Sequence, residues 1–320
     1  MLTRRRFMVA SGVALCVPPM MSACSYQEAL TVAIHRWIGY ESLYLAEQFG
    51  WLPSDISLIS NQNATESVSM LVEGRVKLAC LTLDEVLLVL SASVPVKVGL
   101  IFNVSAGADM VISRYPINEV STLTNIRLAY EPGALGALVL HHFVKAKGLS
   151  LQNIQLIDIP PDQQVTAWEQ GDIDMAITYE PTASMLLARD GMRVFDSREM
   201  PERIFDVLAV RTDLLSRRDH RLMEAMLASH FKALEYIRTQ RQDALYRIAS
   251  RQQAEFSKVQ RALGGVHLPT LESNQRYLSG LDARLMDAVT ELERLMLQSN
   301  IIEDAVTNPD MFDARWLPRK

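Results

Sequence analysis

The sequence is poor in residues that build metal, disulfide and nucleophile sites. It has 3 cysteines and 6 histidines in 320 residues, and none of them form a cluster with the spacing of a zinc site. Neither a G-x-S-x-G nucleophile elbow nor a phosphate-binding P-loop is present. We therefore expect no metal and no cofactor, and nothing in the sequence favours an enzyme.

Positive charge is also scarce. The chain has 32 Lys and Arg residues against 37 Asp and Glu residues, which disfavours a nucleic-acid partner. Apolar residues make up 49% of the chain and charged residues 22%, which is typical of a folded globular protein. The length allows one large or two medium domains.

The first residues, MLTRRRFMVASGVALCVPPMMSAC, have the pattern of an export signal. Arginines are followed by an apolar stretch that is too short to span a bilayer. Residues 21–24 (MSAC) resemble a bacterial lipobox, and residues 3–8 (TRRRFM) resemble a twin-arginine motif. We expect residues 1–23 to be a lipoprotein signal peptide and residues 24–29 to be a tether, with Cys24 lipid-anchored in the membrane of the bacterial envelope. An ordinary cleaved signal or an uncleaved anchor would have a similar pattern.

Loss of this signal would change the cysteine count and the charge. Cys16 leaves with the signal, and an acylated Cys24 would leave Cys80 as the other cysteine, so no disulfide framework is available. Cys80 lies in an apolar run and is expected to be a small buried residue. The mature chain would keep 29 Lys and Arg residues against 37 acids, for a formal charge near −8.

The middle of the chain contains one strand and helix pattern twice. The first copy starts at LTVAIH and continues through ISLIS, ESVSMLVEG and KLACL, and the second starts at IRLAY and continues through IQLIDI, DQQVTAWEQG and DIDMAITYEP. Strands that alternate with helices predict mostly parallel sheets with both faces covered. Two copies of a βαβαβ unit predict two lobes.

The C-terminal part has a different pattern. Residues 217–251, 254–263 and 283–299 read as helices, and we expect them to pack on the first lobe. The expected division is a first lobe of residues 30–112 plus 206–320 and a second lobe of residues 113–205. Extended segments near 111–115 and 206–211 would then be the crossings.

Polar and aromatic residues gather where the predicted strands end and helices begin. Ligands of open parallel sheets bind at this edge, so two such edges that face one another predict a hinged binding cleft. The expected cleft residues are Trp37, Gly39, Tyr40, Glu41, Thr82, Asp84, Glu85, Ser105, Asp109 and Asp206 from the first lobe and its border, and Tyr130, Glu131, Gly133, Ala134, Thr178, Tyr179 and Glu180 from the second.

These segments carry a resemblance to a known family. WIGYESLYLAEQFGWL, LTLDEVLLVL, YEPGALGALVL and TYEPTASMLL resemble the substrate-binding proteins of ABC importers for nitrate, sulfonates, taurine and thiamine-pyrimidine precursors. The resemblance covers nearly the whole mature chain. It implies an α/β, two-lobed type II periplasmic-binding fold with a C-terminal helical segment on the first lobe. It also implies a periplasm-facing monomer that closes on a small ligand and delivers it to a membrane permease with its ATPase.

The acids at the expected cleft favour a basic or heteroaromatic ligand, such as an amine or a pyrimidine. Carboxylates repel an anion, and aromatic rings can stack on a cation or a heterocycle. Each acid has a second interpretation, because Asp and Glu also stabilise first helical turns. Arg36 keeps a sulfonate or nitrate ligand as an alternative, and His35 is expected to be structural. The same fold would also suit a ligand sensor for a membrane signalling protein or an enzyme like those of pyrimidine synthesis.

Overall fold

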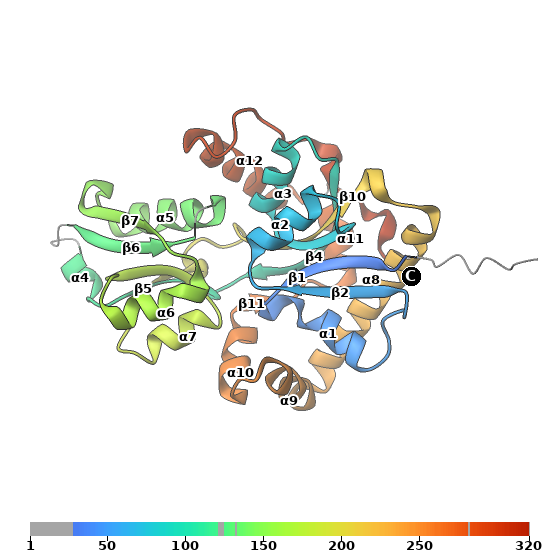
Figure 1. The fold of residues 1–320 in the computed structure, drawn as a ribbon, viewed down its shortest axis with the longest axis horizontal. Helices are drawn as coiled ribbons and strands as arrows, with labels where there is room; N and C mark the ends of the chain where they lie inside the picture. The colour runs from blue at the N-terminus through green and yellow to red at the C-terminus, as the bar shows by residue number, and fades with distance from the viewer. Residues whose placement is uncertain (1–27, 121–124, 132, 281, 320) are drawn as a thin grey trace, which may run out of the picture.

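The computed structural model describes residues 28–120, 125–131, 133–280 and 282–319. The expected signal peptide and Cys24 lie outside these residues. The described chain forms two lobes, each built around one sheet with helices on both faces (Figure 1). The two-lobed α/β architecture is therefore confirmed.

The first lobe has the sheet order β11-β4-β10-β3-β1-β2. Helices α2 and α3 cover one face of this sheet and α1 covers the other (Figure 1). Helix α8 packs on α1. Helix α12 contacts α3 of the first lobe and also α5 of the second lobe. The strands are β1 (Leu30–His35), β2 (Ile56–Asn61), β3 (Leu78–Thr82), β4 (Val96–Ser105), β10 (Phe205–Arg211) and β11 (Val266–His267). The helices are α1 (Glu41–Gln48), α2 (Ala64–Val72), α3 (Leu83–Ser91), α8 (Arg217–Thr239), α9 (Arg241–Gln252), α10 (Phe256–Gly264), α11 (Leu271–Leu278) and α12 (Ala283–Gln298).

The second lobe has the sheet order β7-β6-β8-β5-β9. Helix α5 lies on one face of the sheet, and α6 and α7 lie on the other (Figure 1). The strands are β5 (Asp109–Ser113), β6 (Ile126–Tyr130), β7 (Ile154–Asp158), β8 (Met175–Tyr179) and β9 (Met192–Asp196). The helices are α4 (Ile117–Val120), α5 (Ala134–Lys147), α6 (Pro161–Gln170) and α7 (Thr182–Leu187).

The sequence duplication is present in the two sheets. The order β4-β10-β3-β1-β2 in the first lobe corresponds to β9-β5-β8-β6-β7 in the second. In each lobe the three strands of the repeated unit are parallel. The expectation of mostly parallel sheets is wrong for the whole sheets, because the crossing strands β10 and β5 pair antiparallel with both neighbours.

The crossings lie slightly away from the expected ones. Strand β5 belongs to the second sheet, whereas the expected boundary at residue 113 placed it with the first lobe. The chain passes between the sheets at residues 106–108 and 197–204. The apolar pattern of 109–113 did not reveal this, because a buried strand looks alike in either sheet. The C-terminal part was expected to be all helix, but it also contributes the short strand β11.

The interior confirms the expectation for Cys80. Cys80 on β3 is a fully buried free thiol, and burial raises its pKa well above the ordinary value. Trp168 is buried in the core of the second lobe, with the Arg114 guanidinium 4.1 Å from the centre of its ring. Among the described helices, none combines the length and the apolar character that a membrane crossing requires.

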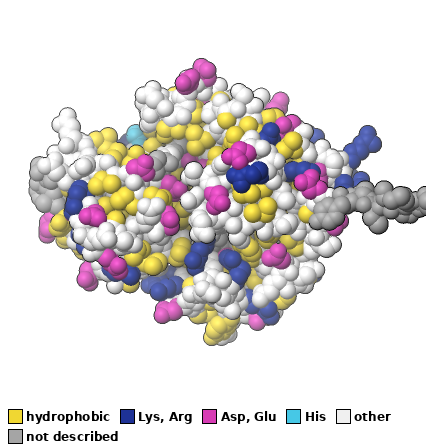
Figure 2. Space-filling model, in the orientation of Figure 1, with side chains coloured by type: hydrophobic (Ala, Val, Ile, Leu, Met, Phe, Trp, Pro, Cys, Tyr) yellow, Lys and Arg dark blue, Asp and Glu magenta, His cyan; other side chains and the backbone are white. Residues whose placement is uncertain are grey.

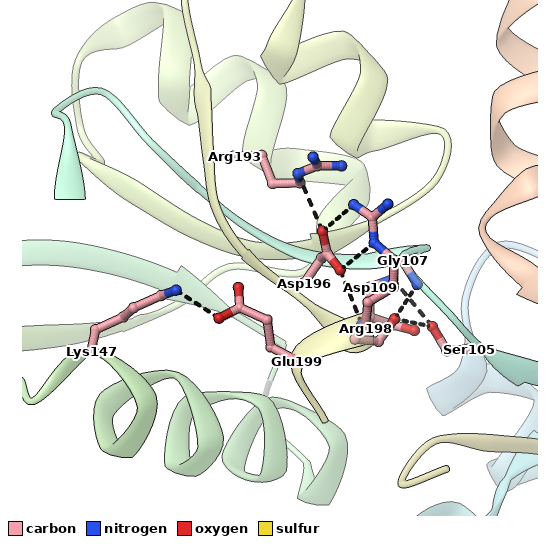
Figure 3. A network of polar contacts seen from close by, with 9 residues as sticks. Ser105, Gly107, Asp109, Lys147, Arg193, Asp196, Arg198 and Glu199 are labelled. Carbon is pink, nitrogen blue, oxygen red and sulfur yellow. Dashed lines mark hydrogen bonds and ion pairs between the residues drawn. The ribbon is translucent and has the colours of Figure 1, made fainter. Parts of the chain in front are cut away.

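Hydrogen bonds join the two crossing segments. The hydroxyls of Ser105 and Ser197 lie 2.7 Å apart, and the backbone N–H of Gly107 donates to Ser197 Oγ at 2.6 Å. Figure 3 shows this junction beside Asp196, which binds the guanidinium of Arg198. Because both crossings meet here, we infer that Ser197 holds the hinge between the lobes.

Replacement of Ser197 by alanine tests this role. Ser197→Ala leaves the Gly107 N–H and the Ser105 hydroxyl without their buried partner, so the free energy of unfolding should fall by about 1–3 kcal/mol. Urea denaturation followed by circular dichroism measures it. Ser91→Ala is the control, because the exposed Ser91 hydroxyl bonds only within its own helix. Equal stability of Ser197→Ala and the wild type would contradict the assignment.

Candidate functional site

A cavity of about 180 Å³ lies between the two lobes. It is formed where β1, β3, β6 and β8 end and the following helices begin, which is the edge at which open α/β sheets bind ligands. The lining residues are His35, Trp37, Ala64, Thr65, Val68, Thr82, Asp84, Glu85, Leu88, Asp109, Glu131, Gly133, Leu135, Gly136, Val139, Pro161, Ile177, Thr178, Tyr179, Ile204 and Asp206.

Many of the residues expected from the sequence line this cavity. The structure brings together ten of them: Trp37, Thr82, Asp84, Glu85, Asp109, Glu131, Gly133, Thr178, Tyr179 and Asp206. They come from segments on both lobes, which is what a hinged cleft requires. Their role as ligand contacts stays a prediction.

Three expected residues near the first corner have other partners. Glu41 is buried and ion-paired with Arg251, and Gln252 donates to its carboxylate at 2.6 Å. The ring of Tyr40 is fully buried. A Cβ added at Gly39 would lie 1.9 Å from the amide group of Asn103, so the small residue allows close packing here.

Other expected residues also lie outside the lining. The Ser105 hydroxyl belongs to the hinge contacts with Ser197. Tyr130 ends β6, half-buried, and Ala134 is the first residue of α5. Glu180 turns onto its own helix, where its carboxylate accepts from the Ser184 N–H at 3.2 Å and from the Ser184 hydroxyl at 2.9 Å. The helix-capping interpretation therefore describes the Glu180 contacts.

Glu180 lines a second space between the lobes. This cavity of about 470 Å³ is also lined by Arg36 and Lys258. Figure 2 shows basic side chains where the lower parts of the two lobes meet. The second cavity therefore differs in charge from the first, and Trp37 contributes to the walls of both.

Trp37 and Tyr179 meet across the lobes. Their ring centres are 5.6 Å apart with the planes at 88°, an edge-to-face contact that favours association beyond the apolar area it buries. Trp37 is oriented by Asn103, whose amide oxygen accepts from the indole Nε1 at 3.2 Å while its nitrogen donates to Asp206 at 2.9 Å. The Tyr40 hydroxyl donates to the same Asp206 carboxyl at 2.7 Å. Tyr40 therefore lies outside the lining but holds Asp206, which is one of the lining residues.

A hydrogen bond also joins the lobes. Asp84 lies in the first turn of α3, and its Oδ2 accepts from the backbone N–H of Leu135 in α5 at 2.8 Å. The residue before α5 is Gly133, which has no side chain for capping. A carboxylate from one lobe therefore caps the helix of the other.

Burial changes the acid–base properties of the lining carboxyls. Burial raises the pKa of Asp109 to about 6. Burial, with the nearby charge of Asp84, raises the pKa of Glu131 to about 7. Burial raises the pKa of Asp206 well above its ordinary value. Burial and the charge of Asp84 do the same for the pKa of Glu85.

The lining offers acceptors and hydroxyls but no cationic side chain. None of the described lining residues is Lys or Arg. Within the described part of the chain, some buried polar atoms of the lining have no hydrogen-bond partner, including Asp109 Oδ2, Thr178 Oγ1 and His35 Nδ1. Such atoms are costly to leave unpaired unless water or another molecule reaches them.

His35 lines the cavity, and its expected structural role stays a prediction. It ends β1 and lines the cavity with Nδ1 unpartnered, and burial lowers its pKa to about 4. The imidazole is therefore neutral at pH 7 and able to donate or accept one hydrogen bond at each nitrogen. Its position at the end of a predicted strand was the sequence feature that indicated a place at the cavity. Apolar lining residues such as Leu135 and Val139 have no such feature in the sequence.

The titration of the lining carboxyls predicts a pH dependence of stability. Asp109 and Glu131 have higher pKa values folded than unfolded, so their protonated forms favour the folded state, and this contribution is lost as pH rises through the folded pKa. Buried histidines with lowered pKa values, such as His35, act in the opposite direction below about pH 6.5, but they titrate alike in the wild type and in Asp109→Asn. We therefore expect the melting temperature of the wild type without ligand to fall relative to that of Asp109→Asn between pH 5 and pH 8. Surface acids with lowered pKa values, such as Asp174, change their protonation state at a pH below this range.

Thermal melting at several pH values checks this prediction. Asp109→Asn should reduce the fall, because the amide does not titrate. A melting-temperature difference between the wild type and Asp109→Asn that is constant or rises from pH 5 to pH 8 would contradict the raised pKa of Asp109.

Within the described residues, no group of three or more His, Cys, Asp or Glu side chains is arranged to hold a metal ion.

Known proteins resemble this chain in sequence over part of its length. Over 153 residues the chain is 24% identical to the taurine-binding periplasmic protein of Escherichia coli K12, covering 47% of this chain and 48% of that protein. The chain spans about half the length of the curated relatives it matches.

Solved structures share the fold. The periplasmic aliphatic sulphonate binding protein SsuA from Escherichia coli has a TM-score of 0.69 at 15% identity, with 92% of each chain covered. A ligand binding component of an ABC-type import system from Staphylococcus aureus, solved with zinc bound, has a TM-score of 0.71 at 12% identity, covering 89% of this chain and 98% of that one. The model of the NMT1-like family matches residues 25–251. Since this match includes more than half of the sequence, the chain belongs to the NMT1-like family.

Proposed function

We propose that this protein is the solute-binding component of an ABC-type import system, and that it captures a small ligand in the cavity between its lobes. The observation that carries the proposal is that both lobes supply walls of one cavity, with Trp37 and Tyr179 in contact across it. The names of the relatives, which are binding proteins and import components, agree with this function. The partners would be a membrane permease and its ATPase, and the protein would act as a monomer without catalytic turnover.

The ligand is proposed to be basic or heteroaromatic, such as an amine or a pyrimidine. Carboxyls line the cavity, and its lining lacks Lys and Arg. A bound cation would make charge-assisted hydrogen bonds to Asp109 and would lower the pKa of that carboxyl. The rings of Trp37 and Tyr179 would contact the cation or stack on a heterocycle.

A sulfonate or nitrate-type ligand is the second candidate, since relatives are named for taurine and for aliphatic sulphonates. Taurine itself carries an ammonium group besides its sulfonate. The carboxyls could bind the ammonium, so taurine suits this cavity better than a simple anion. Ethanesulfonate and nitrate, which have no ammonium group, separate the two candidates.

Calorimetric titration with amines, aminopyrimidines, taurine, ethanesulfonate and nitrate tests the ligand class. Native mass spectrometry of the protein from its host identifies a co-purified molecule. We expect an amine or heteroaromatic ligand to bind and Asp109→Asn to weaken it about 10- to 100-fold, which is the loss of a charged hydrogen bond. Asp174→Asn is the matched control, because Asp174 lies at the opposite end of β8 and pairs with Arg127.

The outcomes separate the candidates. Binding of ethanesulfonate or nitrate alone would overturn the basic ligand and leave solute capture standing. Unaltered binding in Asp109→Asn would show that the ligand lies elsewhere. A wild-type protein that binds none of these compounds and co-purifies with no small molecule would contradict solute capture.

The proposed site of action is the periplasmic side of the bacterial envelope, with the chain anchored by lipid at Cys24. This residue follows the apolar and small-residue pattern of residues 1–23. Metabolic labelling with a radioactive fatty acid in the host should label the wild type and Cys80→Ser but not Cys24→Ser. Labelling of Cys24→Ser, or no labelling of the wild type, would contradict the anchor.

A further inference from the structure

We propose that Asp84 is a built-in counter-anion at the N-terminus of α5 and that it determines ligand specificity by excluding small anions from the cavity. The inference rests on the proposed function of this cavity and adds the residue that selects the ligand class. Asp84 acts from the first lobe on a helix of the second, so the same contact also favours the closed arrangement of the lobes.

The geometry at α5 is that of an occupied anion position. The first N–H groups of a helix have no partner within the helix, and the positive end of the helix dipole attracts negative charge. Helix α5 has 14 residues, and Gly133 before it supplies no capping side chain. Asp84 Oδ2 accepts from the Leu135 N–H at 2.8 Å, and Asp84 itself is 3% exposed. A sulfonate or nitrate that approached this helix end would meet the Asp84 carboxylate there.

Asp84 and its neighbour Glu85 have different roles. The Glu85 carboxyl accepts from the Thr82 N–H at 2.8 Å and so stabilises the start of its own helix α3. Asp84 receives a backbone N–H from the other lobe as well as hydrogen bonds within its own turn. Burial raises the pKa of both carboxyls, and the N–H donors offset part of this increase for Asp84, so Asp84 is the more acidic member of the pair.

A second observation shows which ligand groups the cavity still accommodates. Among the described residues, Asp109 Oδ2 and Thr178 Oγ1 have no hydrogen-bond partner, their residues are 4% and 2% exposed, and both line the same cavity as Asp84. His35 adds an unpartnered ring nitrogen. These atoms suit a ligand with N–H donors. With Asp84 on the helix end and no Lys or Arg in the lining, a simple anion finds repulsion from carboxylates instead.

The test compares anion binding in two acid-to-amide variants of the full-length protein. Asp84→Asn removes the charge from the end of α5, and Asp174→Asn makes the same chemical change outside the cavity, where the carboxylate pairs with Arg127. Isothermal titration with sodium ethanesulfonate and sodium nitrate at pH 7.5 measures the dissociation constants. Asp84→Ser keeps a short capping oxygen without charge. It provides a second measurement of the dissociation constants if Asp84→Asn folds poorly. Circular dichroism checks the fold of each variant.

We expect Asp84→Asn and Asp84→Ser to bind ethanesulfonate at least about tenfold more tightly than the wild type, as removal of one close like charge implies. Asp174→Asn should match the wild type. Equal anion binding in all variants, or an equal gain in Asp174→Asn, would overturn the role of Asp84. The comparison uses ethanesulfonate rather than the natural ligand. A wild type without any small-molecule ligand would therefore contradict the proposed function, while the ethanesulfonate dissociation constants of the variants would still test the role of Asp84.

Discussion

The cavity depends on the antiparallel pairing of each crossing strand with the third strand of a repeated half. In the first sheet Asp206 of β10 lies opposite Thr82 of β3, and in the second sheet Asp109 of β5 lies opposite Tyr179 of β8. Each pairing thus places an aspartate beside a strand end that leads into a helix. Because the chain crosses directly from one sheet to the other, these two aspartates line the same space between the lobes.

Burial controls the electrostatics of that space. Carboxyls brought together with little water do not all ionise at neutral pH, because desolvation disfavours each charge and each charge disfavours the next. Hydrogen bonds offset part of this cost at two of the carboxyls. Asp84 receives the Leu135 N–H of the other lobe, while the Tyr40 hydroxyl and the Asn103 amide bind Asp206. The cavity is therefore a polar acceptor site between apolar walls rather than a uniformly charged surface.

The two acids at equivalent corners of the repeat have different partners. Glu180 follows β8 and turns back to Ser184 in its own helix, whereas Asp84 follows β3 and reaches α5 in the other lobe. The difference arises from the neighbouring helix ends. The residue before α5 is Gly133, which has no capping side chain, whereas Ser184 supplies donors close to Glu180. A repeated sequence pattern thus predicted the position of both acids but not the direction of their side chains.

The sequence by itself determined the repeated α/β halves, the two lobes and the edge that carries the cavity, because periodic apolar strands and helix-start residues are local signals. It also placed Trp37, Asp84, Asp109 and Tyr179 at that edge. Only the tertiary structure decided which sheet holds β5, that His35 lines the cavity and that Glu41 pairs with Arg251. These depend on contacts between residues far apart in the chain, such as Glu41 and Arg251. Strand pairing and packing set such contacts, and no local pattern records them.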